Sequence, residues 1–171
     1  SMPLISYADA RPWAKAIRDE VLSRRMPPWG AIKGFRELRR DASLSQEEIT
    51  RIAEWVEGGA PEGDPKYLPE PPPRTKSQPA SGADSIALPR TLSRAIVLAG
   101  IQPVGPVAGA KITATLPDGR IEPLLWIYAY KAEWKHGFWF AEPLVLPAGT
   151  RIDMPPGVAV RGFISVPKPA R

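Results

Sequence analysis

The sequence predicts an α+β protein, in which a small helical unit and an antiparallel β-sandwich are joined by a proline-rich linker. In the first third of the chain apolar residues recur every three or four positions, whereas from about Leu92 they alternate with polar ones. The chain contains 22 prolines among 171 residues, and they cluster between these two parts. An apolar fraction of 43% is enough for a packed core. From the change of periodicity and the proline cluster we expect a helical unit over residues 2–67, a linker over 68–91 and a β-sandwich-like domain over 92–171.

A first helix is expected from about Tyr7 to Ser23. Ser6 followed three residues later by Asp9 is the pattern of a capping box, in which each side chain accepts a hydrogen bond from a free backbone N–H of the first turn. Pro12 predicts either a kink or a helix start one turn later, because proline has no N–H to donate. One face of this helix is apolar, with residues at four-residue spacing: Trp13, Ile17 and Val21.

A second helix is expected from Ser45 to Gly58. The Met-Pro-Pro-Trp stretch at 26–29 must end the first helix, because the residue before a proline is forced out of the helical region. Residues 30–42 show no periodicity, and we expect a loop there. Ser45 and Glu48 match a second capping box, and the two glycines at 58–59 are a typical helix stop.

The second half of the chain predicts short antiparallel strands. The clearest covers residues 110–116, where Ile112, Ala114 and Leu116 alternate with polar residues ahead of a Pro-Asp-Gly turn. Several short segments at regular spacing are typical of a β-sandwich. The expected strands lie at residues 95–98, 110–116, 124–130, 138–146, 150–154 and 158–166.

Composition excludes several classes of function. The absence of cysteine excludes disulfides, thiolate metal sites and covalently attached haem within this chain. The net charge is +5, but the basic residues are scattered singly, so nucleic-acid binding is not expected. No run of residues approaches the roughly 20 apolar residues of a membrane span, and no signal peptide is visible.

Met26 is the candidate ligand that the sequence offers. A methionine thioether is a soft ligand suited to haem iron or copper(I). The two prolines that follow Met26 fix its backbone direction, and Trp29 could cover one face of a flat cofactor. The alternative is that Met26 packs beneath the loop while the prolines end the helix.

The remaining residues predict no catalytic site and no metal site. His136 is the one histidine of the chain, and its Glu-Trp-Lys-His-Gly surroundings indicate an exposed polar turn. A single histidine does not allow a Ser-His-Asp arrangement to be assembled with confidence. Met154 also precedes two prolines and is expected at the end of a strand.

Three stretches within residues 3–65 carry a family resemblance: Pro-Leu-Ile-Ser-Tyr-Ala-Asp-Ala-Arg-Pro-Trp, then Met-Pro-Pro-Trp, then Trp-Val-Glu-Gly-Gly-Ala-Pro-Glu-Gly-Asp-Pro. Together they resemble part of a bacterial c-type cytochrome domain. In such proteins a Cys-x-x-Cys-His segment precedes the first stretch, and the methionine of the second is the axial haem ligand. The resemblance therefore implies that Met26 descends from that ligand or still serves as it, with Trp29 beside a haem c that only a longer protein could hold.

The β-domain also carries a resemblance. The stretches Leu-Pro-Asp-Gly-Arg-Ile-Glu-Pro-Leu-Leu-Trp and Phe-Ala-Glu-Pro-Leu-Val-Leu-Pro-Ala-Gly-Thr are similar to the domain that follows such cytochrome modules, which itself resembles the C-terminal half of copper type II, ascorbate-dependent monooxygenases. Those enzymes need paired histidines and a methionine, and this chain has one histidine. The resemblance implies the fold without the copper sites.

Three functions remain open on these observations. The first is a non-catalytic, redox-associated binding or structural module. The second is an electron-transfer cytochrome that extends upstream of this chain and uses Met26 as its axial haem ligand. The third is an accessory domain of a copper monooxygenase-like protein. The resemblance implies a periplasmic or other extracytoplasmic location. Because a helical unit of about 60 residues is marginally stable alone, we expect it to contact the β-domain, a partner protein or a second copy in a homodimer.

Overall fold

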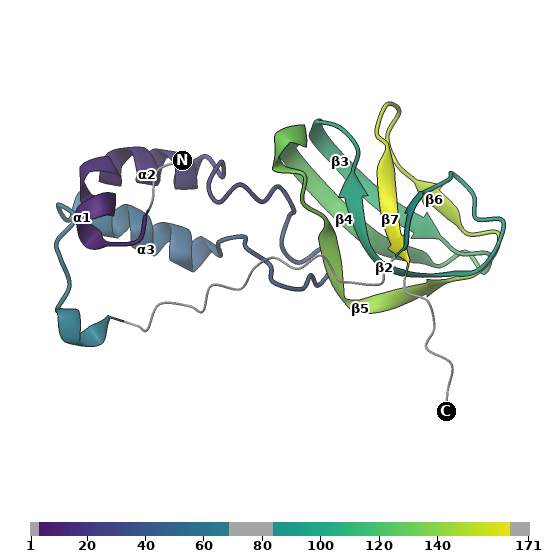
Figure 1. Cartoon of the computed structure of the whole chain (residues 1–171), viewed down its shortest axis with the longest axis horizontal. Helices are drawn as coiled ribbons and strands as arrows, with labels where there is room; N and C mark the ends of the chain where they lie inside the picture. Colours follow the sequence, from purple (N-terminus) through teal and green to yellow (C-terminus); the bar gives the residue numbers. More distant parts are fainter. Residues whose placement is uncertain (1–3, 69–83, 165–171) are drawn as a thin grey trace. The chain divides into compact units, whose positions relative to one another are not determined.

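The computed structural model describes residues 4–68 and 84–164 and divides them into two units, each with its own packing (Figure 1). The helical unit takes its residues from Ser1–Pro27 and Leu44–Pro79, and the β unit takes its residues from Pro28–Ser43 and Ala80–Arg171. The protein is therefore α+β, as the sequence predicts, but the chain passes from one unit to the other three times.

The structure differs from the expected domain limits in two places. Residues 28–43, expected within a helical unit over 2–67, belong to the β unit because they pair with its strands. A strand, β1 (Asp84–Ala87), lies inside the segment 68–91 that was expected to be linker. The rest of the expected linker that falls in 69–83 lies outside the described residues.

The first expected helix is a succession of three short elements. They are α1 (Tyr7–Ala10), the 3-10 helix η1 (Arg11–Trp13) and α2 (Ala14–Leu22). The capping box is confirmed, since Ser6 and Asp9 each accept a hydrogen bond from the other's backbone N–H. Pro12 lies in the first turn of η1, where a missing N–H costs least.

The second expected helix is α3 (Gln46–Glu57), followed by the short 3-10 helix η2 (Pro65–Tyr67). Its capping box is also confirmed, because Ser45 N donates to Glu48 Oε2 over 2.7 Å and Glu48 N donates to Ser45 Oγ over 3.2 Å. The helix ends before Gly59, whose φ of +89° few other residues adopt. The buried apolar side chains of this unit are few: Ala14, Val21, Ile49 and Ala60.

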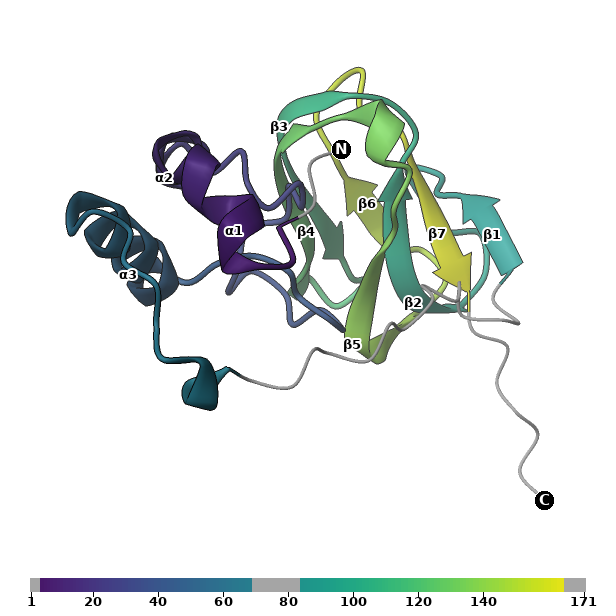
Figure 2. The same ribbon diagram turned by 60° about the vertical axis from the view of Figure 1, so that its left-hand side comes forward.

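The β unit consists of two antiparallel sheets that enclose one core (Figures 1 and 2). One sheet has the strand order β1-β7-β2-β5 and the other β4-β3-β6, so the arrangement is sandwich-like. All six expected strands are found; β5 has the expected limits, and the other five have different ends. Besides β1 they are β2 (Ile96–Pro103), β3 (Val107–Thr115), β4 (Ile121–Tyr130), β5 (Phe138–Leu146), β6 (Arg151–Asp153) and β7 (Val160–Ile164), and the 3-10 helix η3 (Ala132–Trp134) joins β4 to β5.

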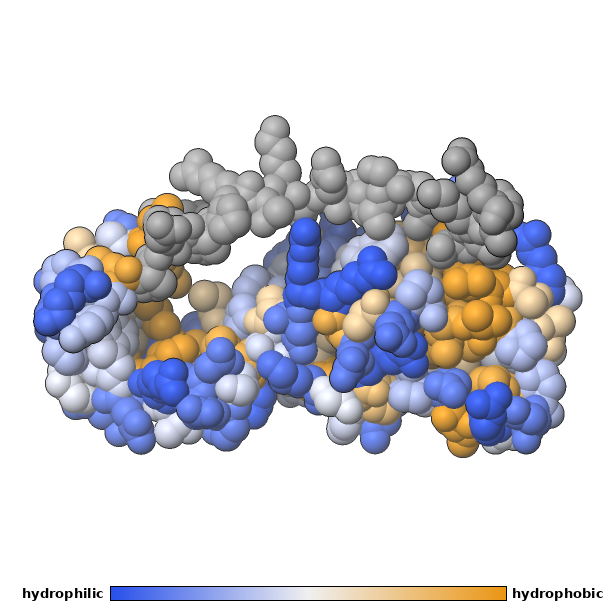
Figure 3. Space-filling model, turned by 90° about the horizontal axis from the view of Figure 1, so that it is seen from below, coloured by the Kyte–Doolittle hydropathy of each residue, from blue (hydrophilic) through white to orange (hydrophobic). Residues whose placement is uncertain are grey.

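The core of the β unit is built by both sheets. Its fully buried side chains include Leu98, Ile101, Ile112, Ile127, Phe138, Phe140, Leu146 and Ile152. Apolar side chains also reach the surface, and Figure 3 shows hydrophobic residues gathered on this unit. None of the described helices has the length and apolar character needed to cross a membrane.

Gly100 holds a position in β2 that needs a glycine. It pairs with Trp139 on one side and Phe163 on the other, and these two rings stack with centroids 4.2 Å apart. A Cβ atom at this position would lie 2.6 Å from the Phe138 carbonyl oxygen. Only a residue without a side chain lets the three strands approach this closely.

Candidate functional site

Residues 28–43, which we call the strap, pair with the outer strand of the three-stranded sheet. Ala31 forms an antiparallel bridge with Ile127 of β4. Two backbone hydrogen bonds of 2.8 Å flank it, from Ile32 N to Trp126 O and from Tyr128 N to Gly30 O. The first part of the strap thereby acts as a very short additional strand at the edge of this sheet.

The second part of the strap pairs with β5, which is the outer strand of the other sheet. Leu38 forms an antiparallel bridge with Phe140. Arg39 N donates to Trp139 O over 2.8 Å, and Glu37 O accepts from the N–H of Ala141 over 2.9 Å. The strap therefore crosses from the edge of one sheet to the edge of the other and covers backbone groups that each edge would otherwise leave unpaired.

Arg36 lies between these two pairings. Its guanidinium carbon is 4.9 Å from the centre of the Phe140 ring, and Nη2 donates to the Glu142 carbonyl oxygen over 3.3 Å. Nη1 is 3.8 Å from Glu122 Oε2 of β4, and the Arg36 side chain is only 18% exposed. One side chain of the strap thus contacts residues of both sheets.

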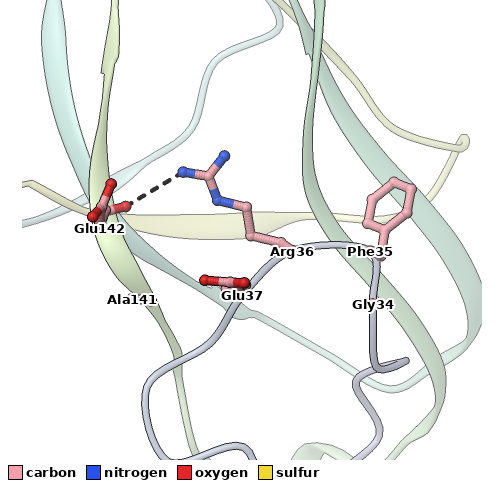
Figure 4. Close-up of a pocket in the computed structure, with 6 residues that line it drawn as sticks. All are labelled: Gly34, Phe35, Arg36, Glu37, Ala141 and Glu142. Atoms are coloured by element: carbon pink, nitrogen blue, oxygen red, sulfur yellow. Dashed lines mark hydrogen bonds between the residues drawn. The ribbon is translucent and has the colours of Figure 1, made fainter.

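A pocket of about 420 Å³ lies where the strap meets β5. Figure 4 shows Arg36 reaching toward Glu142, whereas Phe35 turns to the opposite side. The Phe35 ring meets the Trp126 ring edge-on. The carboxylates of Glu37 and Glu142 form no ion pair with any described residue. The residues that line the pocket are Gly34, Phe35, Arg36, Glu37, Ala141 and Glu142.

His136 is held in an aromatic cluster, not in an exposed polar turn as the sequence indicates. Its imidazole stacks on the indole of Trp29 at 5.2 Å and 11° and on that of Trp134 at 5.8 Å and 8°. Tyr130 and Phe138 approach it edge-on. These neighbours come from the strap, η3, β4 and β5, which no local sequence pattern brings together.

Hydrogen bonds fix the same cluster. His136 Nε2 is 3.0 Å from the Trp29 carbonyl oxygen, so the ring donates to the strap when Nε2 carries the proton. The hydroxyl of Tyr130 donates to the His136 carbonyl oxygen over 3.1 Å. Burial raises the pKa of the Tyr130 phenol above its ordinary value. The one imidazole of the chain thus links the strap to the β unit through ring stacking and a polar contact.

Met26 and Trp29, the candidate cofactor-binding residues, belong to different units. Met26 is half-buried in the helical unit, where its N–H donates to Glu20 O just beyond the end of α2. Trp29 belongs to the β unit and packs edge-on against Phe138 as well as on His136. The indole Nε1 of Trp29 is buried and has no hydrogen-bond partner among the described residues.

The donors of this chain do not fit a covalently bound haem. The chain has no cysteine to form the thioether bonds. Its one imidazole stacks on the Trp29 indole and has its Nε2 3.0 Å from the Trp29 carbonyl oxygen. Within residues 4–68 and 84–164, no three His, Cys, Asp or Glu side chains come together as a metal site.

Comparison of the chain with protein-family models, with curated proteins and with solved structures gave no match.

Sequence reasoning missed the strap, which carries most of the site. Its two pairings are single bridges, too short to produce the alternation by which a strand is found. Gly30 and Gly34, with φ of +80° and +84°, were the available signals, because such glycines mark places where a chain turns sharply. Met154 follows β6 and packs against the core, as expected of a strand end.

Proposed function

We propose that this chain is a non-catalytic, redox-associated binding or structural module. The observation that supports it best is the use made of His136, whose ring and Nε2 are both engaged by the strap. Arg36 is likewise engaged with both sheets. His136 and Arg36, two side chains of a kind that often acts in catalysis, therefore bind other segments of this chain. The redox association and an extracytoplasmic location rest on the resemblance to cytochrome domains.

The helical unit supports a binding role because it leaves apolar side chains uncovered. Trp13 is 50% and Leu22 52% exposed, and Ile5 is 81% exposed. Only four apolar residues are buried within the described part of this unit, which is a small core. A further apolar surface packed against the exposed side chains would therefore add stability. Such a surface is what a partner protein or a second copy would supply.

Titration of the purified chain with haem tests this proposal. We expect no Soret shift that depends on Met26, so the wild type and Met26→Ala should give superimposable spectra. Met154→Ala is the matched control, since it removes a second thioether that also precedes two prolines. A Soret shift that is lost in Met26→Ala and kept in Met154→Ala would contradict a haem-free module.

A second candidate function is electron transfer by a longer protein in which Met26 is the axial haem ligand. The exposed apolar side chains of the helical unit favour it, because a haem is a large flat apolar group. The half-buried position of Met26 in the same unit also favours it. The test is the coding sequence upstream of Met2: an in-frame Cys-x-x-Cys-His would support the carrier, and the longer protein should then show a Met26-dependent Soret band when produced with haem. Absence of that segment would leave the haem-free module.

A further inference from the structure

Three aromatic side chains lie along the outer strand β4 and the strap. Trp126 is 37% and Tyr128 59% exposed, and residues two apart in a strand share one face. Gly109 pairs with Tyr128 across to β3, so no side chain covers the tyrosine from that position. Phe35 of the strap meets Trp126 edge-on at 5.9 Å. Together they form an aromatic surface, which we define as Phe35, Trp126 and Tyr128.

Charges of opposite sign lie at the two sides of the aromatic surface. At one side Lys111 Nζ is 4.1 Å from the Trp126 ring centre, and Lys111 has no carboxylate within ion-pair distance among the described residues. At the other side Phe35 lines the pocket, where the Arg36 guanidinium lies among the lining residues together with the carboxylates of Glu37 and Glu142 (Figure 4). A ligand that lies across the aromatic surface would meet the cation Lys111 at Trp126, and at the pocket it would meet two carboxylates and one guanidinium, so the pocket end is anionic on balance.

We propose that the aromatic surface binds a proline-rich peptide that carries an acidic residue near one end and a basic residue near the other. Proline-rich segments adopt the polyproline II conformation before binding and dock on exposed aromatic rings, which contact the flat proline faces at little cost in entropy. The acidic residue pairs with Lys111, and the basic residue enters the pocket beside Glu37 and Glu142. This inference rests on the binding role proposed above and names the class of partner.

The chain itself contains a sequence of this kind. Residues 68–74 read Leu-Pro-Glu-Pro-Pro-Pro-Arg, with the acidic and the basic residue four positions apart. A second copy of this chain therefore supplies a suitable ligand.

The test is titration of the full-length chain with a synthetic peptide of residues 68–76, followed by the indole N–H signals of the six tryptophans. The receiving chain carries Glu70→Ala and Arg74→Ala, so that its own copy of the sequence does not compete. We expect saturable binding that shifts the Trp126 signal and leaves the Trp13 signal in place. Binding should weaken at least tenfold in Trp126→Ala and in Tyr128→Ala, and should be unchanged in the control Trp13→Ala.

The same titration tests whether the pocket carboxylates bind the basic residue of the peptide. The peptide in which Arg74 is replaced by alanine should bind the wild-type surface more weakly, and Glu37→Gln with Glu142→Gln should abolish that difference. Tyr128→Ala keeps the test valid if Trp126→Ala fails to fold, because the tyrosine ring is the more exposed. Failure to saturate at millimolar peptide would overturn the inference, as would wild-type affinity in both Trp126→Ala and Tyr128→Ala. Binding of a neutral oligosaccharide in place of the peptide, with shifts at the same residues, would overturn it too. None of these results bears on the haem titration, which tests the proposed function separately.

Discussion

Trp29 and His136 stack with ring centroids 5.2 Å apart and planes 11° apart, although 107 residues separate them in the chain. This pair joins the strap to the turn between β4 and β5. It also explains why the segment after Met26 does not belong with the helices that surround it in sequence. The strap is held by the side chains of Trp29 and Arg36 and by backbone pairing with both β4 and β5.

His136→Ala should destabilise the β unit by about 2 kcal/mol, because it removes two stacked ring contacts and one hydrogen bond. Urea unfolding followed by tryptophan fluorescence measures the change. His136→Phe keeps a ring between the two indoles and loses the hydrogen bond to Trp29, so its loss should be smaller. Equal losses in the two variants would mean that stacking contributes nothing.

Arg36→Met should destabilise the β unit by about 1 kcal/mol and make trypsin cleavage after Arg39 faster. The reason is that Arg36 covers the Phe140 ring and approaches carboxylate and carbonyl groups on both sheets. Arg51→Met is the matched control, since Arg51 forms an exposed ion pair with Glu47 one turn away in α3 and should cost less than about 0.5 kcal/mol. Unchanged cleavage in Arg36→Met would argue against the strap being held there.

Gly100→Ala should destabilise the β unit by about 1–3 kcal/mol, the usual effect of forcing extra atoms into a packed region. The added Cβ would meet the Phe138 carbonyl oxygen at 2.6 Å, and this oxygen is a backbone atom of β5, the strand paired with β2. Gly105→Ala is the control, because nothing lies within 4 Å of a Cβ at that position. The midpoint of thermal unfolding of the two variants should differ clearly, and equal midpoints would count against the close approach.

Tyr130 should make the protein less stable at high pH. Burial raises the pKa of the folded phenol above its unfolded value of about 10. The stability linked to this difference is fully present below about pH 10 and is lost as the pH rises through the folded pKa. Tyr130→Phe cannot ionise, so the stability difference between it and the wild type should shift in its favour between pH 9 and 12. A difference that stays constant over this range would contradict the burial of the phenol.

Local interactions account for what the sequence predicted well. Both capping boxes lie within four consecutive residues, and the alternation at residues 110–116 follows from one buried face of β3. The single helix expected over Tyr7–Ser23 becomes three elements, with Pro12 in the middle one.

The site could not be predicted in the same way, because its contacts join distant segments. The expectation for His136 was wrong because Trp29 covers it from the strap. Phe35 and Trp126 are 91 residues apart, so no spacing rule relates them. β1 was missed since its short Asp-Ser-Ile-Ala sequence continues the composition of the linker before it.

Amide hydrogen exchange along the strap tests the central claim that this segment is part of the β unit and is fastened by His136. We predict that the amides of Ile32 and Arg39, which donate to β4 and β5, exchange slowly in the wild type. We also predict that Ile32, the nearer of the two to Trp29, loses protection in His136→Ala while Ile112 in the core of the sheet keeps it. Exchange of Ile32 and Arg39 at the rate of an unstructured chain in the wild type would contradict the account.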